Sequence, residues 1–230
     1  MSKISQFLKL IKLRLTDDVK HLKTSIKTPK IWYGNEYAGF FINPNLLNQD
    51  SIVYSFGIGT DISFDQEIIS KHNAKVFGFD PTPKSINWIK QQNINDNFSF
   101  YDFGISNKTE KVNFFLPKNS NYVSGSMVQQ SNVNTDNYVE VNMKTLSDIM
   151  KELKHTHIDV LKIDIEGSEY AVIENIIESK IDITQLLIEF HDRLFPTKRE
   201  MSKKAVAQLT QAGYKIFGIS HTLEEVSFIK

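Results

Sequence analysis

The chain contains no cysteine among its 230 residues. A disulfide framework and a thiolate-bound metal are therefore excluded, and any metal ion must be held by oxygen or imidazole ligands. No apolar run approaches the ~20 residues that a membrane-spanning helix needs. The first residues also lack the apolar stretch and small-residue cleavage site of a secretory signal. These absences predict a cytoplasmic protein.

The chain also lacks a net charge, because 27 Lys and Arg balance 27 Asp and Glu. The charge is unevenly distributed, since residues 1–30 hold eight Lys or Arg against two Asp and the remainder is correspondingly acidic. Apolar residues from Ile4 to Leu15 follow the spacing of one helix face, opposite these cations. A helix packed on the main domain explains this pattern, and a peripheral membrane contact through residues 1–22 is the alternative.

Short apolar runs rich in β-branched and aromatic residues alternate with helical patterns from residue 51 onward. This alternation is typical of a parallel sheet covered by helices. Strands are expected at 51–57, 74–80, 98–104, 157–167, 185–191, 213–220 and 224–230, and helices at 63–72, 83–92, 145–153, from about 170 to 177, and 197–212. The predicted fold is α/β and Rossmann-like, with a mostly parallel seven-stranded sheet that ends in a C-terminal antiparallel hairpin. Residues 1–50 are expected to form a helical or irregular appendage.

A further strand or hairpin is expected at residues 111–117, inserted before the main fold resumes. A polar segment rich in Asn and Ser follows it, from residue 117 to residue 138. This segment is longer than the ~12 to 15 residues of an ordinary structureless connection. It is either a loop that contacts the substrate or a disordered connection, and composition does not decide between them.

Two glycines, Gly57 and Gly59, lie where the first strand from residue 51 turns into its helix. Without Cβ atoms they let backbone N–H groups approach a ligand closely. Asp80 ends the next strand, where a carboxylate can accept both hydroxyls of a ribose. Ile62 stands at the third glycine position of a dinucleotide motif, which disfavours a pyrophosphate and favours S-adenosylmethionine. The alternative is a tight turn in which Asp80 only caps the following helix.

Four more residues are candidates for the cofactor site. Asp61 and Thr82 follow Gly59 and Asp80 in the same two loops. Asp102, near the end of the third strand, is placed to accept a hydrogen bond from the adenine amino group, with Phe103 against the ring. These placements follow from topology, because open α/β sheets bind ligands at the carboxyl ends of their strands.

Four motifs occur in order along the chain, VYSFGIGTDISFD, VFGFDPTPKSI, VLKIDIEGSEY and LLIEFHDR. Together they resemble the FkbM family of S-adenosylmethionine-dependent methyltransferases, and the resemblance runs from about Trp32 to the C-terminus. It implies a class I methyltransferase fold, with residues 51–230 as the S-adenosylmethionine-binding domain. It also implies methyl transfer to a sugar or polyketide hydroxyl, in bacteria often during synthesis of surface polysaccharides. The expected acceptor is a small molecule or a glycan.

Two pairs of polar residues lie near the ends of the fourth and fifth strands. Asp164 and Glu166 form the first pair, and Glu189 and His191 form the second. Each pair is spaced i, i+2, so both of its side chains point to one face. Because these strands are expected to be near neighbours, all four side chains should converge at the ligand-binding edge.

Methyl transfer to an alcohol needs a base or a metal ion that acts on the O–H group. His191 is the expected general base, with Glu189 or Asp164 orienting it or the acceptor. The alternative is a divalent cation held by Asp164, Glu166 and Glu189. A purely structural role for Glu166 and Glu189, as partners of backbone donors, is the third option.

Two other functions remain open. A nucleic-acid methyltransferase or RNA-binding protein would use the basic residues 1–30, but the neutral total charge makes nucleic acid an unlikely partner. A non-catalytic module of a glycan-assembly complex would dock through the first helix, but the strand-end carboxylates favour catalysis. The sequence indicates no oligomeric state.

Overall fold

The structure is a computed structural model that describes residue 15 and residues 19–117, 133–197 and 199–230. Most of the predicted amphipathic helix, the membrane contact through residues 1–22 and much of the predicted polar connection therefore lie outside the described residues. Within the described part of the chain, no helix has the length and apolar character needed to cross a membrane.

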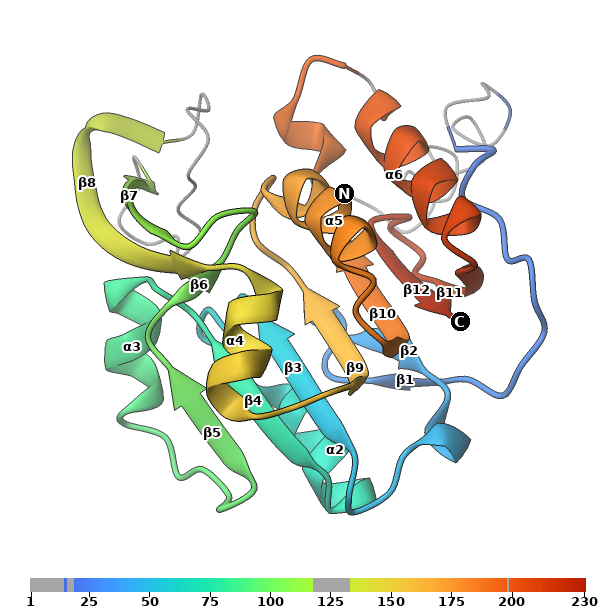
Figure 1. Ribbon diagram of the computed structural model, residues 1–230, viewed down its shortest axis with the longest axis horizontal. Coiled ribbons are helices and arrows are strands. Elements are labelled where there is room, and N and C mark those ends of the chain that lie inside the picture. Colours follow the sequence, from blue (N-terminus) through green and yellow to red (C-terminus); the bar gives the residue numbers. More distant parts are fainter. Residues whose placement is uncertain (1–14, 16–18, 118–132, 198) are drawn as a thin grey trace.

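A seven-stranded sheet forms the centre of the fold (Figure 1). Its strands are β3 (Ile52–Phe56), β4 (Lys75–Phe79), β5 (Phe98–Tyr101), β9 (Ile158–Ile163), β10 (Ile183–Glu189), β11 (Lys215–Ile219) and β12 (Glu225–Ile229). They lie in the order β11-β12-β10-β9-β3-β4-β5. β12 runs antiparallel to β10 and β11, and the other neighbours are parallel. The predicted fold class, including the C-terminal antiparallel hairpin, is confirmed.

Helices cover both faces of this sheet (Figure 1). They are α2 (Ser63–His72), α3 (Pro83–Ile89), α4 (Leu146–Leu153), α5 (Glu169–Ser179) and α6 (Glu200–Gln211), with short 3-10 helices η1 (Pro44–Leu46) and η2 (Asp192–Leu194). Apolar residues of α4, α5 and α6 share one buried cluster with one face of the sheet. Those of α2 and α3 share a second cluster with the other face. The sheet is therefore the middle of three layers.

The central strands β9 and β10 are buried almost along their whole length. A strand of a parallel sheet that is covered on both faces is mainly apolar, as in the segments IDVLKI and ITQLLIE. Both segments also contain polar residues, namely Asp159 and Lys162 in β9 and Thr184 and Gln185 in β10. At or after the ends of these strands lie the four candidate residues Asp164, Glu166, Glu189 and His191. The burial of β9 and β10 explains why they are strands of the core, and it leaves the residues after their carboxyl ends as candidates for a functional site.

A three-stranded sheet lies beside the main one (Figure 1). Strands β7 (Glu110–Pro117) and β8 (Val133–Lys144) pair antiparallel, and β6 (Gly104–Ile105) pairs with β8. The expected extra hairpin is confirmed. Residues 133–138, predicted as part of the polar connection, instead belong to β8, and the predicted third strand ends at Tyr101 rather than at residue 104.

Residues 31–47 pack on the main sheet. Strands β1 (Ile31–Tyr33) and β2 (Phe40–Ile42) pair antiparallel, and their buried side chains share a cluster with α2. The backbone N–H of Asn43 donates to the buried Gln185 side chain over 2.8 Å. The division of the chain at residue 50 stays a prediction.

Candidate functional site

The glycine turn after β3 is packed directly against the turn after β9. Gly57 has φ +81°, in the left-handed region that favours glycine. A Cβ atom there would lie 1.6 Å from the carbonyl oxygen of Asp164, so no other residue fits without a shift of the backbone. The Lys162 ammonium donates to the Gly57 carbonyl over 3.3 Å and lies 3.9 Å from the Asp164 carboxylate. The two loops therefore form one unit.

Asp80 follows β4 and joins the glycine turn to the next loop. Its side chain is 4% exposed, and its Oδ2 atom accepts a hydrogen bond of 2.8 Å from the N–H of Gly59. Its Oδ1 atom accepts from the N–H and the hydroxyl of Thr82, over 2.8 and 2.6 Å. Burial raises the pKa of Asp80, and these hydrogen bonds act in the opposite direction. Because a carboxylate offers about four acceptor positions, Asp80 still has capacity for a ligand.

A pocket opens at the carboxyl ends of β3, β4 and β9. Its wall is formed by Phe56, Gly57, Gly59, Phe79, Asp80, Pro81, Thr82, Gly104, Ile105, Phe114, Met143, Asp164, Ile165, Glu166 and Ser168. Aromatic and aliphatic surface thus surrounds a few convergent polar groups, as is typical of small-molecule sites. The position is the one at which open α/β sheets bind ligands.

Three predicted cofactor residues do not line this pocket. Asp61 accepts a hydrogen bond of 2.8 Å from the N–H of Ser63, at the start of α2. Asp102 is exposed, because β5 ends before it. Phe103 is 7% exposed, and the Lys144 ammonium lies 4.0 Å from the centre of its ring. Their contact with the cofactor stays a prediction.

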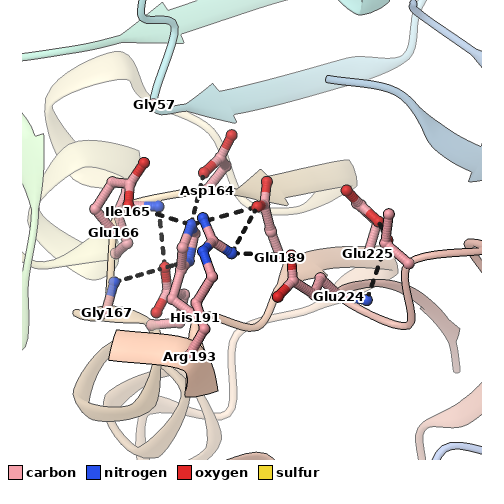
Figure 2. A network of polar contacts seen from close by, with 12 residues as sticks. Gly57, Asp164, Ile165, Glu166, Gly167, Glu189, His191, Arg193, Glu224 and Glu225 are labelled. Atoms are coloured by element: carbon pink, nitrogen blue, oxygen red, sulfur yellow. Dashed lines mark hydrogen bonds and ion pairs between the residues drawn. The ribbon is translucent and has the colours of Figure 1, made fainter. Parts of the chain in front are cut away.

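The side chains of the two strand-end pairs meet around His191 (Figure 2). The ring of His191 is 1% exposed, and its Nε2 atom lies 3.6 Å from Asp164 and 3.5 Å from Glu166. The same atom lies 3.4 Å from Glu189. Neighbouring strands β9 and β10 therefore bring together the four residues predicted to converge.

Glu169, which is not among the residues predicted from the sequence, is hydrogen-bonded to His191 and to the turn after β9. It is fully buried, and its Oε1 atom accepts hydrogen bonds from Nδ1 of His191 over 2.7 Å and from the N–H groups of Ile165 and Gly167 over 3.1 Å. A signal was present, because position 169 shares the buried face of α5 with Val172, which lies three residues on. A carboxylate on such an apolar face requires partners.

The electrostatics of the cluster favour a positive charge at the His191 ring. Burial alone would lower the pKa of His191, but the carboxylate of Glu169, with those of Asp164 and Glu189, raises this pKa to about 10. Burial, followed by the charge of Asp164, raises the pKa of Glu189. Arg193 lies 3.5 Å from Glu189, and its positive charge acts on this pKa in the opposite direction.

One set of side chains in the described residues has the arrangement of metal ligands. One atom each from Asp164, Glu166 and His191 lies within 4.8 Å of the other two. The metal ligands predicted from the sequence are Asp164, Glu166 and Glu189, with Glu189 in place of His191. His191 belongs to the observed set of possible ligands because its Nε2 atom points between the carboxylates of Asp164 and Glu166 (Figure 2).

Comparisons with known proteins identify one family and two similar proteins. The Methyltransferase FkbM domain matches residues 35–216. Human probable methyltransferase-like protein 24 is 25% identical over 154 residues, which cover 66% of this chain and 36% of that protein. The crystal structure of methyltransferase FkbM from Methylobacillus flagellatus KT has a TM-score of 0.52 and 13% identity, over 96% of this chain and 52% of that one. The chain thus spans about a third and about half of these two relatives, and it shares the fold of the second.

Proposed function

The chain belongs to the FkbM methyltransferase family, and we propose that it methylates a hydroxyl group of a sugar or another small molecule. The methyl donor is S-adenosylmethionine, which supplies an electrophilic methyl group on a sulfonium sulfur. The observation that carries the proposal is that Asp164 and Glu166 line the same pocket as Gly57 and Asp80. A binding surface for an adenosine and a group that can act on an O–H thus share one cavity.

The residues of the pocket fit the methyl donor. Gly59 and Thr82 occupy three of the about four acceptor positions of Asp80, which leaves capacity for a ribose hydroxyl. The left-handed turn at Gly57 brings the backbone up to the pocket. Phe79, Ile105 and Met143 offer apolar surface that suits a purine ring. We therefore assign Gly57, Gly59, Asp80 and Thr82 to donor binding.

The acceptor hydroxyl requires a group that takes its proton as its oxygen bonds to the methyl carbon. A general base must reach that proton within about 3.2 Å, and Asp164 and Glu166 line the pocket whereas the ring of His191 is 1% exposed. We therefore propose that the carboxylate of Asp164 or Glu166 accepts this proton. His191, expected from the sequence to be the base, is buried behind these carboxylates, with its Nε2 atom 3.6 Å from Asp164 and 3.5 Å from Glu166.

A transfer assay tests this proposal. The purified chain is incubated with S-adenosylmethionine labelled in the methyl group and, in parallel, with free hexoses, nucleotide sugars, a bacterial polysaccharide and RNA. We expect label in a carbohydrate fraction, as an alkali-stable methyl ether. Label found only in RNA, or released by mild alkali as methanol from an ester, would contradict methylation of a hydroxyl of this class.

The place of action is a separate proposal. We propose that the reaction takes place in the cytoplasm, where S-adenosylmethionine is made and where a chain without cysteine needs no oxidising compartment. The membrane contact through residues 1–22 stays a prediction.

A further inference from the structure

The Nε2 atom of His191 points at three carboxylates without a hydrogen bond to any of them. Its distances to the nearest oxygens of Asp164, Glu166 and Glu189 are 3.6, 3.5 and 3.4 Å. Hydrogen bonds from a ring nitrogen to oxygen are about 2.7 to 3.2 Å long. The carboxylates thus surround the nitrogen at a common distance that is too long for direct bonding.

The distances from Nε2 to Asp164 and Glu166 are close to those between two ligands of a small cation. Ligand atoms that each lie ~2.1 Å from a tetrahedral metal ion are ~3.4 Å apart from one another. The atoms of Asp164, Glu166 and His191 keep their mutual distances within 4.8 Å, so a modest side-chain adjustment brings all three into contact with one ion.

Glu169 gives His191 the setting of a metal-binding histidine. Such a histidine usually donates its second ring N–H to a carboxylate, which fixes the tautomer and the ring orientation. Here Nδ1 lies 2.7 Å from the fully buried Glu169 and donates to it. A metal cation that replaces the proton on Nε2 keeps the positive charge that the carboxylates favour at this position, and it binds the Nε2 lone pair. The same Glu169 oxygen accepts from the N–H of Gly167 and so holds the turn that carries Glu166.

We propose that Asp164, Glu166 and His191 bind a divalent transition-metal ion such as Mn²⁺ or Zn²⁺ at the edge of the pocket. Mixed imidazole and carboxylate ligands suit such ions better than Mg²⁺ or Ca²⁺, which favour oxygen alone. Three protein ligands with one open position are the arrangement of catalytic rather than structural metal sites. Asp164 and Glu166 line the pocket, so the open position faces the space for the acceptor.

The role of the ion rests on the proposed function. The acceptor hydroxyl takes the open position through its oxygen, and coordination lowers the pKa of that hydroxyl. The O–H bond then breaks, and its electron pair forms the bond to the methyl carbon while the C–S bond breaks and leaves its electron pair on the sulfur. The proton passes to the oxygen of Asp164 or Glu166 that does not bind the ion, since both carboxylates line the pocket.

A titration with Mn²⁺ tests the site directly, because the electron paramagnetic resonance signal of free Mn²⁺ decreases as the ion binds. We expect the full chain to bind one Mn²⁺, and Glu166→Gln and Asp164→Asn each to weaken binding by about 10-fold or more. Glu140→Gln removes an exposed carboxylate that pairs with Lys111 on the hairpin, and should leave binding unchanged. Circular dichroism confirms that the variants are folded.

The result that overturns the inference is the absence of a stoichiometric Mn²⁺ site, or a site whose affinity is the same in Glu166→Gln, Asp164→Asn and the unaltered chain. Equal weakening in Glu140→Gln also overturns it, since the loss would then reflect total charge. Binding of S-adenosylhomocysteine in the presence of a chelator is measured in parallel. If that binding persists without a Mn²⁺ site, the metal inference fails and the methyltransferase proposal stands.

Discussion

Replacing Asp80 with alanine should weaken the binding of S-adenosylhomocysteine by about 10- to 150-fold. The expectation follows from the ~1.5 to 3 kcal/mol that a hydrogen bond to a charged group contributes. S-adenosylhomocysteine has the same adenosine as the methyl donor and no transferable methyl group, so its calorimetric titration measures binding alone. The substitution also removes the contacts of Asp80 with Gly59 and Thr82, which adds to the loss.

The control for this prediction is Asp96→Ala, which removes an exposed carboxylate from the loop before β5 and should leave affinity unchanged. Asp80→Asn keeps the shape of the side chain and serves if the alanine variant does not fold. An affinity unchanged in both Asp80 variants would remove Asp80 from the binding site. Asp80 would then have only a structural role, in which it accepts hydrogen bonds from Gly59 and Thr82.

Asp164→Asn should lower the rate of methyl transfer by about 10²- to 10⁴-fold, the range for loss of a group that acts on the reacting proton. The amide has the same size as the carboxylate but neither accepts the proton nor binds a cation with comparable strength. Affinity for S-adenosylhomocysteine should change by only a few-fold, because the adenosine is assigned to Asp80 and the glycine turn. The measurements are initial rates with the acceptor found in the transfer assay and a parallel calorimetric titration.

Asp182→Asn is the matched control, because Asp182 is exposed and directly precedes β10, at the opposite edge of the sheet from His191. Its rate should equal that of the unaltered chain. A full rate in Asp164→Asn would show that the strand-end carboxylates do not act on the acceptor. A rate lost together with cofactor affinity would instead indicate that Asp164 shapes the donor site.

The parts of the molecule that the sequence predicts well are those in which one local pattern has one structural solution. The apolar character of β9 and β10 predicts two strands that are buried on both faces. The predicted fourth strand is too long, because β9 ends at Ile163 rather than at residue 167. Asp164 and Glu166 therefore lie in the turn after β9, and Glu166 has a φ of +52°. The convergence of these side chains with Glu189 and His191 follows once the two strands are neighbours. The parallel pairing of β9 with β10 provides that adjacency.

The parts that the sequence does not predict depend on contacts between distant segments. Glu169 is hydrogen-bonded to His191, which lies 22 positions later in the chain. In the sequence, only the place of Glu169 on the buried face of α5 indicates that its carboxylate needs a partner. The sequence predicts a third strand that includes Phe103, but β5 ends at Tyr101 and the chain continues into β6, which pairs with β8. The long strand β8 takes up residues whose polar composition resembles that of a loop. In each case the partner segment decides the structure.

The pocket between the glycine turn and Asp80 is expected to bind the methyl donor. The most direct test is a calorimetric titration of the full chain with S-adenosylhomocysteine, in the presence of a chelator and then with Mn²⁺. We expect one binding site with a dissociation constant in the micromolar range under the first condition. Absence of binding under both conditions, by a chain shown to be folded, would contradict it.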